Sequence, residues 1–221
     1  DTDRSRGLGD VYKRQIKEKA RQLPIVECYI GTKWDYMGEK TVIVTRQHPQ
    51  GHFTMGVYLV DIYCKGLLHS EYFFNMNHDD YEMMVKRIDM DEDLKKAAYA
   101  DAHKLVYGAI DFAEAVGIDS EDSFDITKYI LDEKKEEIPF AEFGKNGKHY
   151  LRADTDEEAE LYIPIIMEAI GTDFTYSIEG VTDGEVDAAE VPLGDFDFSE
   201  LNYDEEEFDK MFEKLNRESQ D

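Results

Sequence analysis

The apolar residues of the chain form their longest run over residues 52–64, where Asp61 is the single acid. Such a run, bounded by Gln50-Gly51 and Lys65-Gly66, predicts a central strand with both faces covered. Further segments rich in β-branched and aromatic residues have the pattern of strands. They cover residues 25–30, 41–46 and 67–75. Because short turns join these segments, we expect an antiparallel meander in the first third of the chain.

From residue 79 onward the apolar positions repeat every three to four residues, which predicts helices. Asp79 and Asp80 are expected to cap a helix through Met90. Its buried side chains are predicted to be Tyr81, Met84, Val85 and Ile88. Residues 91–93 are expected to start the longest helix, which ends at Gly117.

The segment after Gly117 is predicted to add a short helix, a hairpin and a last helix. The short helix starts at Ser120 or Asp122, and residues 138–143 and 148–153 are expected to pair around an Asn-Gly turn. Thr155 and Glu158 form a capping box for a helix to residue 170. Pro164 is expected to kink or restart that helix.

Strands followed by helices predict an α+β fold, with an antiparallel sheet of three to five strands and helices packed on it. Residues 1–15 lack an apolar period and are expected to be an artefactual or disordered leader. Residues 16–180 are predicted to form a single domain. Residues 181–221 carry 15 acids and 3 bases, which predicts a disordered acidic tail.

The charge balance narrows the possible ligands. The chain has 51 acidic and 25 basic residues, a formal net charge of −26. Nucleic-acid backbones and anionic membranes both require a positive face, so direct binding to either is not expected. The charge suits a protein partner, a basic one in particular, or mimicry of nucleic acid. Aromatic residues among the acids of the tail are the candidate anchors for such a partner: Phe196, Phe198, Tyr203, Phe208 and Phe212.

Cysteine usage and hydropathy indicate the compartment. Cys28 and Cys64 both lie in apolar, strand-like segments without metal-site spacing, which is typical of buried thiols in a reducing environment. No apolar run reaches the ~18–20 residues of a membrane span, and no signal peptide is recognisable. We therefore expect a cytoplasmic protein, and no cofactor is predicted.

Asp61 and His103 are the most interesting candidates for catalysis. A buried acid and a histidine can form a general acid–base dyad, and burial would raise the pKa of the aspartate toward a useful range. The alternative is structural: Asp61 binds backbone N–H groups or Tyr107, and His103 is a satisfied residue at the edge of the core.

Other candidates have weaker patterns. Cys64 with His69 or His103 could pair a nucleophile with a base, but no nucleophile elbow or oxyanion loop surrounds the cysteine. Arg46 could anchor an anion or pair with a surface acid. A group of histidines and acids could hold a metal, although their spacing matches no standard site. This group is His48, His52, His69, His78, Asp79 and Asp80.

Several segments between residues 16 and 153 match segments of other proteins, and they occur in the same order along the chain. They are residues 18–25, 42–46, 48–49, 56–66, 103, 106–114, 125–131 and 142–148. Together they resemble an uncharacterised family of hypothetical proteins from gut-type Bacteroidota. The resemblance implies no activity and assigns no residue a role. Residues 7–15 resemble a translated sequencing adapter at the end of a metagenomic reading frame, so residues 1–15 are left out of the fold prediction.

Three functions follow as hypotheses. The first is a non-enzymatic binding or scaffold protein that acts through a protein partner. The second is a hydrolase-type enzyme that uses Asp61 and His103. The third is an acidic mimic of nucleic acid that inhibits a nucleic-acid-binding protein.

Overall fold

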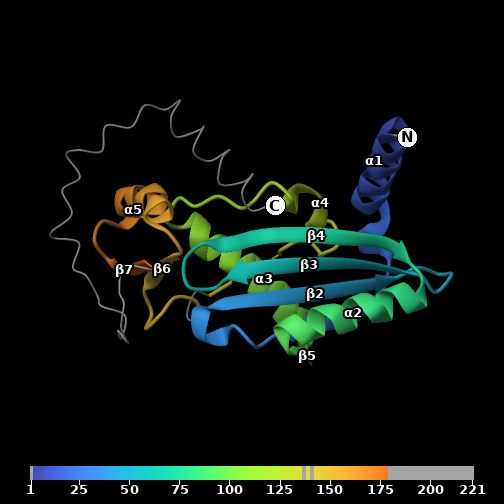
Figure 1. Cartoon of the computed structure of the whole chain (residues 1–221), viewed down its shortest axis with the longest axis horizontal. Coiled ribbons are helices and arrows are strands. Elements are labelled where there is room, and N and C mark those ends of the chain that lie inside the picture. Colours follow the sequence, from blue (N-terminus) through green and yellow to red (C-terminus); the bar gives the residue numbers. More distant parts are fainter. Residues whose placement is uncertain (1, 136–137, 140–141, 179–221) are drawn as a thin grey trace. The chain divides into compact units, whose positions relative to one another are not determined.

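A five-stranded antiparallel sheet is the main element of the protein (Figure 1). The computed structural model describes residues 2–135, 138–139 and 142–178, with the backbone alone over residues 2–10. Across the sheet the strands are β4 (Gly66–Met76), β3 (Phe53–Asp61), β2 (Glu39–Gln47), β1 (Ile25–Gly31) and β5 (Leu94–Lys96). The predicted α+β class and antiparallel sheet are confirmed. The middle strand is β2 and not the long apolar strand β3, because β5 extends the sheet beyond β1.

Two helices cover the two faces of the sheet: α2 (His78–Glu92) and α3 (Tyr99–Glu114) (Figure 1). Successive residues of a strand point to opposite faces. Val42 accordingly belongs to the core beneath α3, whereas its neighbour Ile43 packs with Tyr81 of α2. Burial on both faces explains why β2 and β3 are buried along most of their length.

The segment between α2 and α3 differs from the prediction. Asn77, not Asp79 or Asp80, is the N-cap of α2, and its side chain accepts a hydrogen bond from the backbone N–H of Asp80. The helix ends where Asp93 adopts a left-handed conformation with φ of 50°. A helix start at residues 91–93 is therefore wrong, because the next three residues form β5 against β1 and α3 begins only at Tyr99.

A second, two-stranded sheet lies in the later part of the chain. Its strands β6 (His149–Ala153) and β7 (Phe174–Ile178) run parallel, joined by α5 (Asp156–Ile170). Parallel strands require a crossover connection, and α5 provides it. Residues 140–141 of the predicted hairpin lie outside the described residues; among the described residues, the strand paired with β6 is β7 and not the segment around residues 138–143.

Local signals in this later part are nevertheless confirmed. Asn146 has the positive φ, 55°, expected of the Asn-Gly turn. Thr155 caps α5 by accepting a hydrogen bond from the backbone N–H of Glu158 at 3.1 Å. The helix continues through Pro164, however, without restarting.

The remaining helices are short or terminal: α1 (Thr2–Lys19), η1 (Ala20–Gln22), η2 (Asp35–Met37) and α4 (Phe124–Thr127). Residues 2–15, for which an artefactual or disordered leader was predicted, belong to the helix α1. Ile16 and Ala20 are buried in the core with α3. All of these helices and strands belong to one compact unit. Residues 179–221, including the predicted acidic tail, lie outside the described residues.

Candidate functional site

Asp61, the predicted catalytic acid, ends β3 and is 3% exposed. Its carboxylate accepts hydrogen bonds from the backbone N–H groups of Tyr63 at 2.6 Å, Lys65 at 3.1 Å and Cys64 at 3.4 Å. Burial raises the pKa of Asp61, and the N–H groups offset this only in part. The carboxylate therefore closes the turn between β3 and β4, which is the structural alternative considered for this residue.

The same turn is joined to the second sheet by an ion pair. The ammonium group of Lys65, 9% exposed, lies 2.8 Å from Oε1 of Glu158 in α5. Burial acts to lower the pKa of Lys65, but the charge and hydrogen bond of Glu158 outweigh it and raise the pKa. Glu158 also accepts a hydrogen bond from the backbone N–H of Asp154. The ion pair of Lys65 with Glu158 thus links α5, which joins β6 to β7, to the main sheet.

His103 lies on α3 in different surroundings from those of Asp61. Its Nε2 is 3.0 Å from the backbone oxygen of Asp132. A carbonyl oxygen can only accept, so Nε2 carries a proton and a neutral His103 has its lone pair on Nδ1. The ring packs between Tyr99 and Tyr107, with centroid distances of 5.6 and 4.7 Å. No hydrogen bond between described residues joins His103 to Asp61, so the structure does not bring the predicted dyad together.

The acid beside His103 is Asp132, which no pattern in the sequence singled out. Its carboxylate lies 2.7 Å from Nη2 of Arg46. Arg46 is 2% exposed and also donates to the backbone oxygens of Leu23 and Ile130, each at 2.6 Å. Of the two roles considered for Arg46, the structure has the ion pair with an acid. The guanidinium of Arg46 thus binds two loops, one at Leu23 and one at Ile130 and Asp132, at the end of β2.

A cavity of about 470 Å³ opens beside this group. Tyr99, His103, Asp132, Lys134 and Lys135 contribute to its lining. Burial raises the pKa of the Tyr99 phenol to about 12, so its hydroxyl stays protonated at neutral pH. The cavity thus offers hydrogen-bonding groups and charges of both signs, because Asp132 and Glu133 line it together with the lysines. Serine, threonine and cysteine are absent from its described lining, so a hydroxyl or thiol nucleophile of these three residue types is not found there.

The two cysteines, and the histidines His48 and His52, also lie in surroundings that indicate structural roles. Cys28 and Cys64 are free and buried. Burial raises the pKa of Cys28 to about 11 and raises that of Cys64 as well, so both remain thiols at neutral pH. Within the described ranges, no three His, Cys, Asp or Glu residues lie close enough together to hold a metal ion. His48 and His52 bind Thr54 and Asn75.

The outer surface of α2 is the most prominent apolar feature that points to solvent. Met83 and Met90 are 65% and 77% exposed, and their spacing of seven residues places them on one side of the helix. The exposed acids Asp79, Asp80 and Asp91 surround them. The exposure of both methionines could be predicted from the sequence. If Tyr81, Met84, Val85 and Ile88 face the core, the helical period places Met83 and Met90 on the solvent side.

The predicted tail anchors Phe196, Phe198, Tyr203, Phe208 and Phe212 lie outside the described residues. Among the helices that are described, none combines the length and the apolar character needed to cross a bilayer. No protein-family model matches the chain, and the comparisons with curated proteins and with solved structures give no match either.

Proposed function

We propose that the chain is a non-enzymatic binding protein that acts through a protein partner, which docks on the outer surface of α2. The observation that carries the proposal is the pair of exposed methionines, Met83 and Met90, stacked along one side of the helix. Methionine is unbranched and polarizable, and it adapts to partners of varied shape. Exposed apolar side chains with a polar rim are typical of protein interaction sites.

The charge around the methionines indicates the chemistry of the partner. Asp79, Asp80 and Asp91 are exposed on this side of α2. Of the two nearby cations, Lys86 is already paired with Glu82 at 3.3 Å. An apolar centre within an acidic rim complements a basic amphipathic segment, whose apolar side chains would cover the methionines.

The same acids bear on the hypothesis of a nucleic-acid mimic. A mimic requires an unbroken array of negative charge on one face, because it must imitate regularly spaced phosphates. On α2, Arg87 and the two methionines interrupt the acids. The apolar centre therefore favours a protein-docking surface over a mimic.

The chemically reactive groups support a binding protein over an enzyme. Asp61 is bound by three backbone N–H groups, and the thiols of Cys28 and Cys64 are buried and protonated. The proposal places the protein in the cytoplasm, where two free, unpaired cysteines are stable.

Titration calorimetry with a synthetic basic peptide tests the proposal. The peptide has lysines on one side of a helical repeat and leucines at positions i, i+4 and i+7. Replacing both methionines by glutamine (Met83→Gln with Met90→Gln) preserves helix propensity but removes the apolar anchors. Because each buried methionine contributes roughly 1.5–3 kcal/mol, losing both is expected to lower the affinity by about 100-fold or more.

Two controls separate this surface from general charge attraction. Tyr36→Ser removes an apolar side chain that is 70% exposed outside α2 and is expected to leave the affinity unchanged. A peptide of the same composition in scrambled order is expected to bind weakly. Equal binding of both peptides, or equal affinity of the double glutamine variant, would refute docking on α2.

A further inference from the structure

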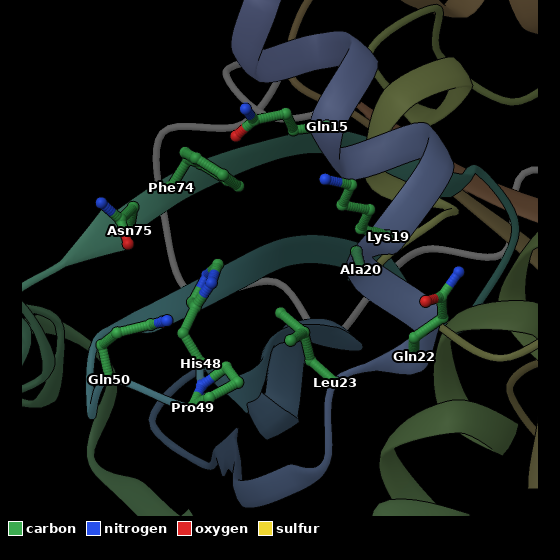
Figure 2. A pocket seen from close by; sticks show the side chains of 10 residues that line it. All are labelled: Gln15, Lys19, Ala20, Gln22, Leu23, His48, Pro49, Gln50, Phe74 and Asn75. Atoms are coloured by element: carbon green, nitrogen blue, oxygen red, sulfur yellow. The ribbon is translucent and has the colours of Figure 1, made fainter.

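A second concave site lies between the C-terminal end of α1, the β2–β3 loop and the end of β4 (Figure 2). Its volume is about 390 Å³, at the lower end of the roughly 300–1,000 Å³ of small-molecule pockets. Three groups of side chains line it: Gln15, Lys19, Ala20, Gln22 and Leu23 from the helical end, His48, Pro49 and Gln50 from the loop, and Phe74 and Asn75 from β4.

The lining differs in chemistry from the rest of the chain. Acidic residues make up 51 of the 221 positions, yet none occurs among the ten residues of this pocket. Four of the ten are side-chain amides instead: Gln15, Gln22, Gln50 and Asn75. A carboxamide both donates and accepts hydrogen bonds, so this lining suits a ligand with several hydroxyl groups.

The pocket has one fixed charge. Lys19 is exposed and its side chain points toward the hollow in Figure 2. No ion pair within the described part of the chain neutralises its ammonium group. His48 adds no second charge, because burial and the nearby His52 lower its pKa below the usual value. Its Nε2 shares a hydrogen bond with Thr54 at 2.8 Å, which fixes the ring beside the pocket.

Apolar surface completes the lining. The side chain of Leu23 lies between the helical end and the loop, and Phe74 lies on the side of β4 (Figure 2). The edge-to-face contact of His48 with Phe74, at a centroid distance of 5.5 Å and 87°, holds both rings in place. A ligand that presents C–H groups on one side and hydroxyls on the other would match this arrangement.

We propose that this pocket binds a small polyhydroxylated carboxylate of the sugar-acid class. Lys19 pairs with the carboxylate, and Leu23 and Phe74 contact the C–H face. The amide of Gln50 binds hydroxyl groups, as do the amides of Gln22 and Asn75 through the capacity left beside their hydrogen bonds to the Glu18 carbonyl and to His52. A single cation matches a monoanion better than a phosphate dianion. Because Gln15 ends the stretch that resembles an adapter, the proposal does not depend on it. The site shares no residue with the docking surface on α2.

Titration of the full chain with glucuronate, followed by calorimetry and by the side-chain amide signals in NMR spectra, tests the proposal. We expect millimolar or tighter binding that weakens with added salt. Glucose, which lacks the carboxylate, is expected to bind at least tenfold more weakly. Acetate and inorganic phosphate, which lack the hydroxyl groups, are expected to bind more weakly still.

Two variants locate the site. Lys19→Met is expected to weaken glucuronate at least tenfold without changing the affinity for glucose. Gln50→Glu keeps the shape of an exposed side chain but adds a negative charge, and it is expected to weaken glucuronate more than glucose. Lys17→Met, a lysine on the same helix outside the pocket, is the matched control and should bind as the unaltered chain does. Circular dichroism establishes that each variant is folded.

The proposal is overturned if glucuronate fails to bind at millimolar concentration, or if acetate or phosphate binds as tightly as glucuronate does. It is also overturned if Lys17→Met and Lys19→Met reduce binding equally, because the attraction would then be general to the helix.

Discussion

Replacing Asp61 tests whether this acid is structural. Asp61→Ala removes the acceptor of three backbone N–H groups in a turn where the acid is 3% exposed. The bonds at 2.6 and 3.1 Å have good lengths, whereas the one at 3.4 Å is weak. Each buried donor left without an acceptor costs about 1–3 kcal/mol. We therefore expect Asp61→Ala to lower the free energy of unfolding by about 2–5 kcal/mol.

Asp61→Asn is expected to be milder. The amide keeps one oxygen to accept from the N–H of Tyr63, but its NH₂ group faces a donor where the second carboxylate oxygen stood. One unsatisfied donor predicts a loss of about 1–2 kcal/mol.

The pH dependence of this loss has a definite sign. The ordinary pKa of an aspartate is 3.8, and burial raises the pKa of Asp61 in the folded protein. Between the two values the folded chain holds a proton that the unfolded chain has released, so stability decreases as pH rises through this window. The Asp61→Asn variant has no such proton. The stability difference between the unaltered protein and this variant is thus largest below pH 3.8 and shrinks as pH rises through the raised pKa.

Urea titrations at a series of pH values measure this difference, with the single tryptophan, Trp34, as the fluorescent probe. Subtracting the variant from the unaltered protein cancels the titration of the other acids. A loss for Asp61→Ala below about 0.5 kcal/mol would place the variant within the range of ordinary surface substitutions and refute the structural role. A difference for Asp61→Asn that grows with pH would show that the hydrogen bonds, and not burial, dominate the pKa.

Three further predictions concern the core. Arg46→Met is expected to cost about 3–5 kcal/mol in urea unfolding, since it leaves buried carbonyls without donors, and Arg46→Lys is expected to be nearly as damaging because it loses the forked geometry. Cys28 and Cys64 are expected to resist Ellman's reagent in the native protein and to react fully in denaturant; rapid native labelling of either would contradict their burial. Gly66→Ala forces a β-carbon to within 2.6 Å of a side chain of α3 at φ of +74°, whereas Gly51→Ala, at φ of +86°, meets nothing within 4 Å. In thermal unfolding, Gly66→Ala is expected to lower the free energy of unfolding by about 1–3 kcal/mol more than Gly51→Ala does. Equal losses for the two variants would exclude the steric explanation.

The parts of the fold that the sequence predicted are those determined by local pattern. The first four strands follow from apolar runs and short turns, and the cap at Thr155 follows from a spacing of three residues. The errors are elements that depend on partners distant in sequence. β5 is a short strand that exists through its pairing with β1, far earlier in the chain. β6 has an ordinary strand pattern, but its pairing with β7 depends on a crossover helix and not on the nearby Asn-Gly turn.

The same distinction holds for the candidate site. The sequence indicates that Asp61 is buried, because it interrupts a long apolar run. It left open whether Asp61 binds backbone N–H groups or Tyr107, and it does not indicate that the acid near His103 is Asp132. The ion pair of Arg46 with Asp132 joins residues 86 positions apart, and no spacing rule covers such a contact. Met83 and Met90, by contrast, could be placed on the outside of their helix from periodicity alone.

The buried charges of this protein have a common position that explains why they are poor candidates for catalysis. Asp61 and Lys65 lie at the turn between β3 and β4, and Arg46 lies near the end of β2. Chain reversals at these points leave backbone N–H and C=O groups that no strand neighbour satisfies, so charged side chains bind them or join separate segments across the gap. A charged residue in this position stabilises the fold, whatever the protein binds. Met83, Met90 and Lys19 are exposed, and the described part of the chain gives them no such role. Substitutions at these positions are expected to leave the fold intact, so binding experiments are most decisive there.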